Sequence, residues 1–200
     1  PFLKLRHQGM VLGPDNRKMS KRWGNVVGLD EVIEKFGADT VRMYELFMGP
    51  FADMKSWQTY GVEGIFRFLN RLYRKFESTY TQGGDTGLVN KIVNQLVKRV
   101  EGDIENMTFN TGISSMMEAF NKMSDTNGNW TSAWEQFVLV LAPYAPYLAE
   151  EMWQKLGHLD SVHSQKWPTH DPKLILDEKL TIVVQINGKV RDKFETSGDI

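Results

Sequence analysis

The clearest hydrophobic pattern in the chain lies between residues 62 and 80. At about 100° per residue, apolar side chains fall on one face of a helix and cations on the opposite face. The apolar face consists of Val62, Ile65, Phe66, Leu69, Leu72, Tyr73, Phe76 and Tyr80. The opposite face carries Arg67, Arg71, Arg74 and Lys75. The pattern predicts an amphipathic helix that buries its apolar side. The four positive charges on its other side suit the phosphate backbone of RNA.

Helical periodicity returns in three further segments. The first covers about 88–100 and the second about 110–124, and loops at 82–87 and 125–129 precede and follow them. The third begins near Thr131, is interrupted by Pro143, and restarts with Pro146 in a first helical turn. The side chains that we expect to be buried include Leu88, Val89, Ile92, Val93, Leu96, Val97, Val100, Ile113, Met116, Met117, Phe120, Met123, Trp134, Phe137, Val138, Leu141, Leu148, Met152, Trp153 and Leu156. Four or five antiparallel helices with short connections form a bundle.

The first fifty residues combine short elements. Residues 8–12 are expected to form a strand and residues 13–16 a turn. Asp30 is expected to cap a short helix that buries Val32, Ile33 and Phe36 and ends at Gly37. A second helix is expected to begin at Asp39 or Thr40 and to stop at Gly49-Pro50, after burying Val41, Tyr44, Phe47 and Met48.

The last part of the chain predicts a β-hairpin over residues 179–194, turning at Asn187-Gly188. A two-residue loop would place the aliphatic row opposite Lys189, Arg191 and Lys193. A three-residue loop pairs Val184 with Val190 and Leu180 with Phe194, and we prefer it because the register follows the buried face. An isolated hairpin is marginal in water, so we expect it to begin a truncated α+β domain.

The predicted fold is therefore mainly α. Residues 1–56 hold a cationic loop with short strands and helices, and residues 57–157 form the antiparallel bundle. Residues 158–178 form a linker, which Trp167-Pro168 pins to the bundle, and residues 179–200 hold the hairpin. Because the chain starts at Pro1 and stops just past a strand, we expect it to be a fragment of a longer protein.

Composition narrows the class of protein. The chain has 200 residues, 41% of them hydrophobic, which is enough for a core, and no cysteine. There is no disulfide framework and no apolar run long enough for a membrane span, so a soluble cytoplasmic protein is expected. The net charge of −1 restricts RNA binding to local patches. His158, His163 and His170 have no metal-ligand spacing, and we expect no metal site.

The candidate catalytic residues lie in residues 17–25, where Arg17, Lys18, Lys21 and Arg22 belong to the most basic segment of the chain, residues 1–25. A lysine ammonium is a compact charge that suits phosphate oxygens. When pyrophosphate leaves ATP, negative charge develops on it, and cations that stabilise this charge lower the barrier of the reaction. Gly24 gives such a loop the freedom to close. Because short motifs occur by chance, the alternative to a phosphate-binding loop is a basic surface turn without function.

These residues resemble the KMSKS signature of class I aminoacyl-tRNA synthetases. The sequence departs from it at Arg22, where Ser is usual, and at Trp23, where a small or basic residue is common. Residues 8–12 with 37–42, residues 61–71 and residues 185–191 resemble the leucyl branch of the family. Residues 141–153 resemble the last part of the anticodon-binding helical domain, which in that branch supports the tRNA without reading the anticodon.

The resemblance implies ATP-dependent activation of leucine and transfer of the leucyl group to the 3′ end of leucine tRNA, with Mg²⁺ as cofactor, in a monomer without membrane contact. It implies that Lys18 and Lys21 are catalytic, and that the nucleotide-binding residues are Lys18, Met19, Ser20, Lys21 and Arg22. The candidates for tRNA contacts are Arg67, Arg71, Arg74, Lys75, Lys189 and Arg191. The chain lacks the family's HIGH motif, leucine pocket and editing domain, so we expect no activity from it alone.

Two alternatives stay open. A class I synthetase for valine, isoleucine or methionine shares the general plan, although the hairpin sequence argues against it. A non-catalytic helical module that binds RNA or assists assembly would show the same bundle and the same cationic face.

Overall fold

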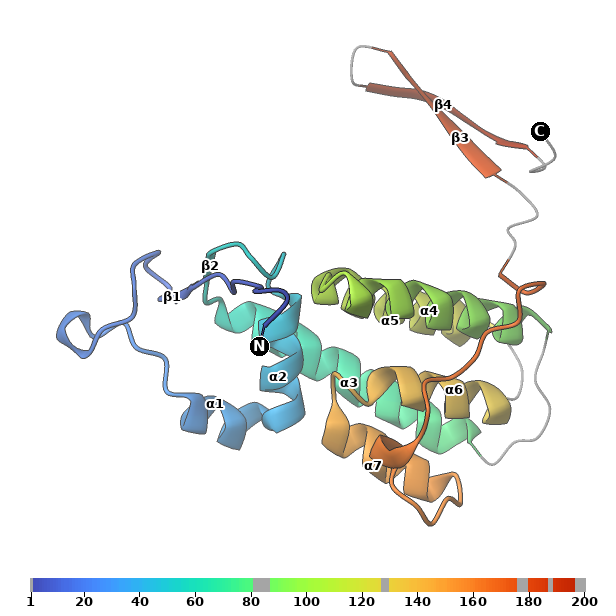
Figure 1. Cartoon of the computed structure of the whole chain (residues 1–200), viewed down its shortest axis with the longest axis horizontal. Helices are drawn as coiled ribbons and strands as arrows, with labels where there is room; N and C mark the ends of the chain where they lie inside the picture. Colours follow the sequence, from blue (N-terminus) through green and yellow to red (C-terminus); the bar gives the residue numbers. More distant parts are fainter. Residues whose placement is uncertain (1, 81–86, 127–129, 176–179, 187–188, 197–200) are drawn as a thin grey trace.

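The computed structural model describes residues 2–80, 87–126, 130–175, 180–186 and 189–196. Helices dominate these residues, and a small two-stranded sheet lies near the N-terminal end, so the mainly α prediction is confirmed (Figure 1). The predicted loops at 82–87 and 125–129 fall mostly outside the described residues, as do Asn187 and Gly188. In the described part of the chain, no helix is long and apolar enough to cross a membrane.

The N-terminal elements differ in detail from the prediction. The strand expected over residues 8–12 is only β1 (Val11–Leu12), which pairs in parallel with β2 (Lys55–Ser56). Gly9 instead passes so close to residue 53 that a Cβ built on it would lie 1.7 Å from the Asp53 carbonyl oxygen. The 3-10 helix η1 (Lys21–Trp23) follows, and then helices α1 (Leu29–Phe36) and α2 (Ala38–Phe47).

Two helix starts were predicted wrongly, and so was one buried residue. Gly28, not Asp30, is the N-cap of α1, and Asp30 lies within its first turn. α2 begins at Ala38 because Gly37 ends α1 with φ +84°, a left-handed backbone that lets one residue separate the two helices. Ile33 is 40% exposed, whereas Phe36 is buried and Val32 is half-buried against the core.

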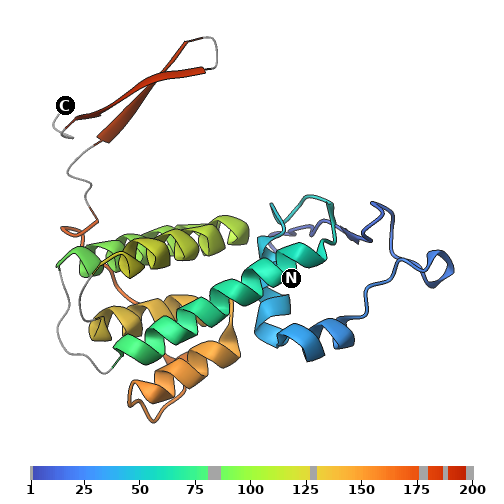
Figure 2. The same ribbon diagram turned by 180° about the vertical axis from the view of Figure 1, so that it is seen from behind.

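The predicted bundle is confirmed and consists of α3 (Thr59–Thr79), α4 (Gly87–Glu105), α5 (Phe109–Ser124), α6 (Thr131–Leu141) and α7 (Pro146–Lys155). Figures 1 and 2 show three layers, with α4 and α5 side by side, α3 and α6 in the middle, and α7 on the far side. Pro146 occupies the first turn of α7 as predicted, and Gly157 with φ +99° follows its end.

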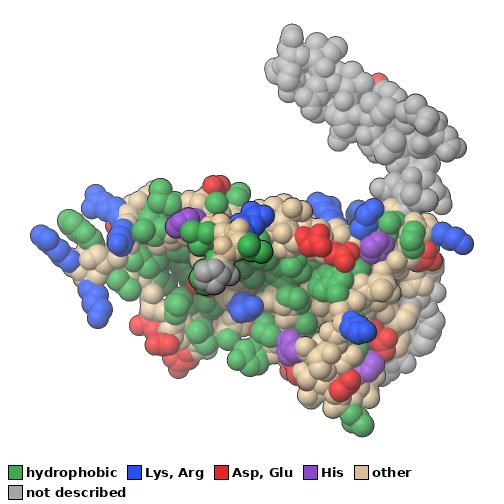
Figure 3. All heavy atoms as spheres, viewed as in Figure 1, with side chains coloured by type: hydrophobic (Ala, Val, Ile, Leu, Met, Phe, Trp, Pro, Cys, Tyr) green, Lys and Arg blue, Asp and Glu red, His purple; other side chains and the backbone are tan. Residues whose placement is uncertain are grey.

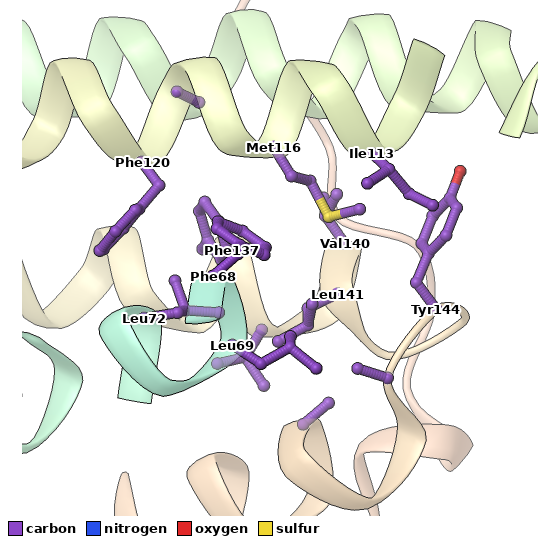
Figure 4. Close-up of a cluster of buried hydrophobic side chains, with 14 of the residues drawn as sticks. Phe68, Leu69, Leu72, Ile113, Met116, Phe120, Phe137, Val140, Leu141 and Tyr144 are labelled. Atoms are coloured by element: carbon purple, nitrogen blue, oxygen red, sulfur yellow. The ribbon is translucent and has the colours of Figure 1, made fainter. Parts of the chain in front are cut away.

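The core lies where these layers meet. Figure 4 shows Phe68 and Leu72 of α3, Phe120 of α5 and Phe137 of α6 pointing toward one another. All four are at most 5% exposed, and burying each side chain contributes about 1.5–3 kcal/mol. The helical pattern predicts that Phe66 is buried and does not include Phe68, whereas Phe66 is 38% exposed and Phe68 is 5% exposed. Leu88 was also predicted buried but is 56% exposed, in the first turn of α4.

Polar contacts join the N-terminal elements to the bundle. The carboxylate of Asp39 accepts hydrogen bonds from the backbone N–H groups of Tyr147 at 3.3 Å and Leu148 at 2.7 Å, and so caps α7. Arg42 donates through Nε and Nη2 to the Pro143 carbonyl at 3.2 and 3.1 Å. Both residues stand on α2, so this helix is joined to the start of α7 and to the connection that precedes α7.

The segment after α7 runs back across the bundle. The 3-10 helix η2 (Val162–Ser164) buries Val162, and Trp167 with Pro168 packs against the core as predicted. His158 stacks on Trp153 with ring centroids 3.7 Å apart, and its Nε2 lies 3.2 Å from Glu135. His170 lies 3.9 Å from Glu101 on a different helix. Each of these histidines therefore has a separate carboxylate partner.

Strands β3 (Leu180–Ile186) and β4 (Lys189–Thr196) form the predicted antiparallel hairpin, but the register that we preferred is wrong. Ile186 pairs with Lys189, as a two-residue loop requires, and Gln185 pairs with Val190. A bulge then shifts the register, so that Ile182 pairs with Phe194. β4 thus has one more residue than β3 between the pairs Val184–Asp192 and Gln185–Val190, which is a β-bulge.

Candidate phosphate-binding loop and cationic helix face

The cationic loop leaves β1 and returns toward it. The backbone of Lys18 forms an antiparallel bridge with Leu12, and the N–H of Gly13 donates to the Arg17 carbonyl at 2.8 Å. A Cβ on Gly13 would lie 2.9 Å from Asn25 and from Asp15, so the closed base of the loop requires glycine there. In Figures 1 and 2 the loop projects at the end of the molecule farthest from α4 and α6.

Asn25 holds the two arms of the loop together. Its Oδ1 accepts from the backbone N–H of Ser20 at 2.8 Å, and its Nδ2 donates to the Lys18 carbonyl at 3.3 Å. Nδ2 also donates to Asp15 Oδ1 at 2.9 Å, and this hydrogen bond is the main cause that lowers the pKa of Asp15 below its ordinary value of 3.8. One side chain therefore joins three points of the loop.

Ser20 starts the turn that carries the second pair of cations. Its Oγ accepts from the Arg22 N–H at 3.2 Å and caps η1. Gly24, with φ +62°, ends η1, and its N–H donates to the Lys21 carbonyl at 3.3 Å. The loop is thus a defined turn with Lys21 at its start.

The four cations of the loop point outward. Arg17, Lys18, Lys21 and Arg22 are exposed, and Figure 3 shows lysine and arginine side chains gathered at this tip. Among the described residues, none of the salt bridges joins these cations to a carboxylate. Asp15, the only acid before residue 30, is already tied to Asn25. The arrangement leaves a concentrated positive charge for an anionic ligand.

The structure divides the predicted cationic face of α3 in two. Arg71 donates from Nη2 to Asn121 Oδ1 at 2.6 Å and lies over the ring of Phe120. The ammonium of Lys75 stands 4.6 Å from the ring centroid of Trp130, and Lys75 is half-buried. These two cations pack against α5 and the start of α6. Arg67 and Arg74 are exposed, seven residues apart on one side of the helix.

The remaining candidates lie in β4. The backbone of Lys189 pairs with Ile186, while Arg191 falls at the bulge between the pairs of Val190 and Asp192. The side chains of Lys189 and Arg191 are outside the described part of the structure. The exposed cations of the helix face are thus Arg67, Arg74 and Arg71, the last of which is hydrogen-bonded to Asn121, and the hairpin candidates stay predictions.

Asp15 and Asn25, which hold the loop together, were not predicted from the sequence. Both lie outside the stretch of cations, and only the folded loop brings their side chains together. Short polar side chains that bond to nearby backbone groups are typical of turns, so an Asp before the cations and an Asn after them were the available signal.

Comparison with known proteins identifies the family. A family model described as the anticodon-binding domain of tRNA ligase matches residues 88–199, more than half of the chain. The chain belongs to this tRNA ligase family. A second model, described as class I tRNA synthetases (I, L, M and V), matches residues 1–56, which contain the cationic loop.

The similar proteins of the tRNA ligase family are leucine–tRNA ligases, which confirms the resemblance to the leucyl branch. The chain is 46% identical over 200 residues to leucine–tRNA ligase from Leptospira biflexa, covering 97% of the chain and 23% of that protein. It is 45% identical over 201 residues to leucine–tRNA ligase from Chlorobaculum parvum, covering 98% of the chain and 25% of that protein. The chain therefore spans about a quarter of the length of the curated relatives that it matches.

Solved structures agree. The ternary complex of Agrobacterium radiobacter K84 agnB2 LeuRS with tRNA and LeuAMS superposes with a TM-score of 0.81 at 30% identity, covering all of this chain and 28% of that one. Methionyl-tRNA synthetase from Mycobacterium tuberculosis superposes with a TM-score of 0.54 at 14% identity, covering 79% of this chain and 43% of that one, which shows a shared fold alone.

Proposed function

We propose that this chain is the part of a leucine–tRNA ligase that carries the triphosphate-stabilising loop and the helical body on which the tRNA docks. The whole enzyme joins leucine to ATP, giving leucyl-adenylate and pyrophosphate, and then moves the leucyl group to the 3′ end of leucine tRNA. The carrying observation is the loop of residues 13–25, in which Asn25 fixes a turn with four exposed cations. Identity to leucine–tRNA ligases along almost the whole chain supports it.

Lys18 and Lys21 are the proposed catalytic residues. The backbone at Lys18 is held by the bridge to Leu12 and by Asn25, whereas Lys21 begins the turn that Gly24 ends. Two ammonium groups on opposite arms of one loop suit a chain of phosphates, and they act most strongly where charge develops on the leaving pyrophosphate. Met19 and Ser20 shape the loop, and Arg22 adds a phosphate contact.

Mg²⁺ does not fit the residues of this loop. Its ligands are carboxylate and other oxygens, and the only acid before residue 30 is Asp15, whose Oδ1 accepts from Asn25 and from the Arg17 N–H. In this proposal the metal comes with the phosphates of ATP.

The tRNA is the proposed macromolecular partner. Its phosphate backbone follows the exposed Arg67 and Arg74, with Arg71 and Lys75 contributing charge from packed positions. Lys189 and Arg191 remain weaker candidates. In this proposal residues 1–56 complete a catalytic domain and residues 57–157 form the helical domain on which the tRNA docks. Residues 158–178 are the linker to residues 179–200, which begin a tRNA-contacting domain. The whole enzyme is proposed to be a cytoplasmic monomer.

Leucine-dependent exchange between ATP and pyrophosphate tests the proposal, measured on the full-length ligase that contains this segment. Lys21→Ala is expected to lower the rate of adenylate formation more than it weakens leucine binding. Equal losses in both would restrict Lys21 to substrate binding. The 200-residue chain alone is expected to show no exchange, and exchange by the purified chain would contradict the proposed division of the enzyme.

A further inference from the structure

Trp23 is the one tryptophan of the six that lies largely in solvent. It is 58% exposed, at the end of η1 and directly after Arg22. Trp57, Trp130, Trp134 and Trp153 are at most 5% exposed, and Trp167 is half-buried against the core. A tryptophan buries a large apolar area when it packs, so an exposed ring on a cationic loop leaves a stacking surface unused.

The guanidinium groups of Arg17 and Arg22 lie over this ring without stacking closely on it. The Cζ atoms of Arg17 and Arg22 lie 5.7 and 5.6 Å from the ring centroid, near the outer limit of about 6 Å for a cation–π contact. A group stacked flat on the ring would approach to about 3.5–4.0 Å. Both guanidinium groups therefore lie farther from the ring than a stacked group would, and a planar partner that stacks on the ring displaces one of these exposed arginine side chains.

The loop also fixes where the ring stands. The N–H of Trp23 donates to the Ser20 carbonyl at 3.0 Å, and Ser20 is in turn held by Asn25. The backbone of Lys18 is tied to the same Asn25. The aromatic ring and the cations thus belong to one small turn, which is the combination that binds a nucleobase by stacking and its phosphates by charge.

We propose that Trp23 is a base-stacking residue, and that the cationic loop binds a nucleobase joined to phosphates. The base stacks on the Trp23 ring, and the phosphates contact Arg17, Lys18, Lys21 and Arg22. This inference rests on the proposed function and deepens it, because phosphate binding alone requires no aromatic ring. Two sources carry this chemistry, ATP and an unpaired strand such as the 3′ end of a tRNA.

The test uses the 200-residue chain and three ligands, each titrated by calorimetry at low salt: tripolyphosphate, which has no base, ATP, and a short unpaired oligoadenylate. Trp23→Leu removes the ring, and Trp23→Phe keeps an aromatic face. Tyr147→Leu is the matched control, because Tyr147 is a 73% exposed aromatic residue on α7. Quenching of tryptophan fluorescence gives a second readout, since Trp23 is the exposed fluorophore.

The wild-type chain is expected to bind ATP or oligoadenylate more tightly than tripolyphosphate. Trp23→Leu should weaken binding of the base-containing ligand about tenfold and leave tripolyphosphate binding unchanged. Trp23→Phe should retain most of the affinity for the base-containing ligand. Whichever base-containing ligand shows the loss identifies the source. A wild-type chain with no preference for a base, or a Trp23→Leu variant that weakens all three ligands equally or none, would overturn the inference.

The two proposals fail in different ways. If tripolyphosphate binds without any base preference, the stacking role of Trp23 fails and the phosphate role of the loop stands. If tripolyphosphate does not bind either, the phosphate role fails as well.

Discussion

The side-chain amide of Asn25 accepts a 2.8 Å hydrogen bond from the backbone N–H of Ser20 and so closes the cationic loop. The same amide reaches the Lys18 carbonyl at 3.3 Å, so the backbones of two residues within the cationic stretch depend on one neutral side chain. The cations repel one another, and a neutral amide holds the turn without cancelling their charge. An acid at this position would weaken the positive field that the loop presents to a ligand.

Replacing Asn25 by Ala should loosen the loop and leave the bundle intact. The backbone N–H of Ser20 loses its acceptor, so its hydrogen exchange should become at least several-fold faster, while the melting temperature changes little because the loop lies outside the core. Hydrogen exchange read by NMR checks both effects. In the full-length ligase the same variant should slow adenylate formation, since the lysines are no longer held in place. Unchanged exchange at Ser20 would contradict the role of Asn25.

A second prediction concerns Gly112 on α5, which lies under the ring of Tyr144. A Cβ on Gly112 would stand 2.5 Å from the Tyr144 hydroxyl oxygen and 3.3 Å from its Cζ. An Ala in a helix normally gains up to about 1 kcal/mol over Gly, but overpacking costs about 1–3 kcal/mol. Gly112→Ala should therefore lower the free energy of unfolding, measured by urea denaturation.

Tyr144→Phe provides the rescue. It removes the hydroxyl that a Cβ would strike, so the double variant should recover most of the stability lost in Gly112→Ala. Gly102→Ala on α4 is the matched control, because a Cβ there meets nothing within 4 Å and should stabilise the chain slightly. Independent, additive effects of Gly112→Ala and Tyr144→Phe would show that the clash is not the cause.

Periodicity predicted the helices of the bundle well, and it failed where a third element decides burial. Phe66 and Phe68 illustrate the limit. Phe68 faces Phe120 of α5, with ring centroids 5.9 Å apart, and is buried. Phe66 meets Phe36 of α1 at 5.6 Å and keeps one side in solvent, because α1 is short. A helical wheel gives the angle of each side chain around the helix axis, but it does not give the length of the neighbouring helix that covers that side chain.

In the candidate site, too, local features could be predicted from the sequence and contacts between distant residues could not. The residues of the loop could be named from their charge and spacing, since local composition decides them. The roles of Asn25 and Asp15 depend on contacts across the turn. The cations predicted on one face of α3 are exposed or half-buried, as expected. The sequence could not show that Arg71 lies over the ring of Phe120 and Lys75 over the ring of Trp130. Such contacts depend on which helices become neighbours.

The cations of α3 should separate into two classes on mutation. Arg67→Ala and Arg74→Ala should each weaken binding of leucine tRNA several-fold and lower the salt slope of binding by about one, with no change in melting temperature. Lys75→Met should lower the melting temperature, since Lys75 lies 4.6 Å from the Trp130 ring centroid and is half-buried. Salt titrations of labelled tRNA, with an RNA duplex as competitor, check the first class. Identical salt slopes in wild type and in Arg67→Ala would remove Arg67 from the interface.

The last prediction concerns Glu150 on α7, which ties the segment after the bundle to the bundle. Glu150 Oε2 accepts from the Ser161 hydroxyl at 2.8 Å and from the Val162 N–H at 3.0 Å. The Ser161 hydrogen bond is the main cause that lowers the pKa of Glu150 below its ordinary value of 4.5. A carboxyl whose pKa is lower in the folded state stabilises the fold above its unfolded pKa, and that stabilisation is lost as the pH falls through the folded pKa.

Glu150→Gln should therefore melt at a lower temperature than the wild type at pH 7, and the difference should shrink as the pH drops below about 4.5, the ordinary carboxyl pKa. Ser161→Ala removes the hydroxyl donor but keeps the carboxylate, so it should reproduce part of the loss with the same pH dependence. Thermal melts at several pH values between 7 and the onset of acid unfolding measure both variants. A difference in melting temperature that stays constant across this range would assign the effect to packing, because an ionised carboxylate gains more from these donors in the folded state than a protonated carboxyl group does.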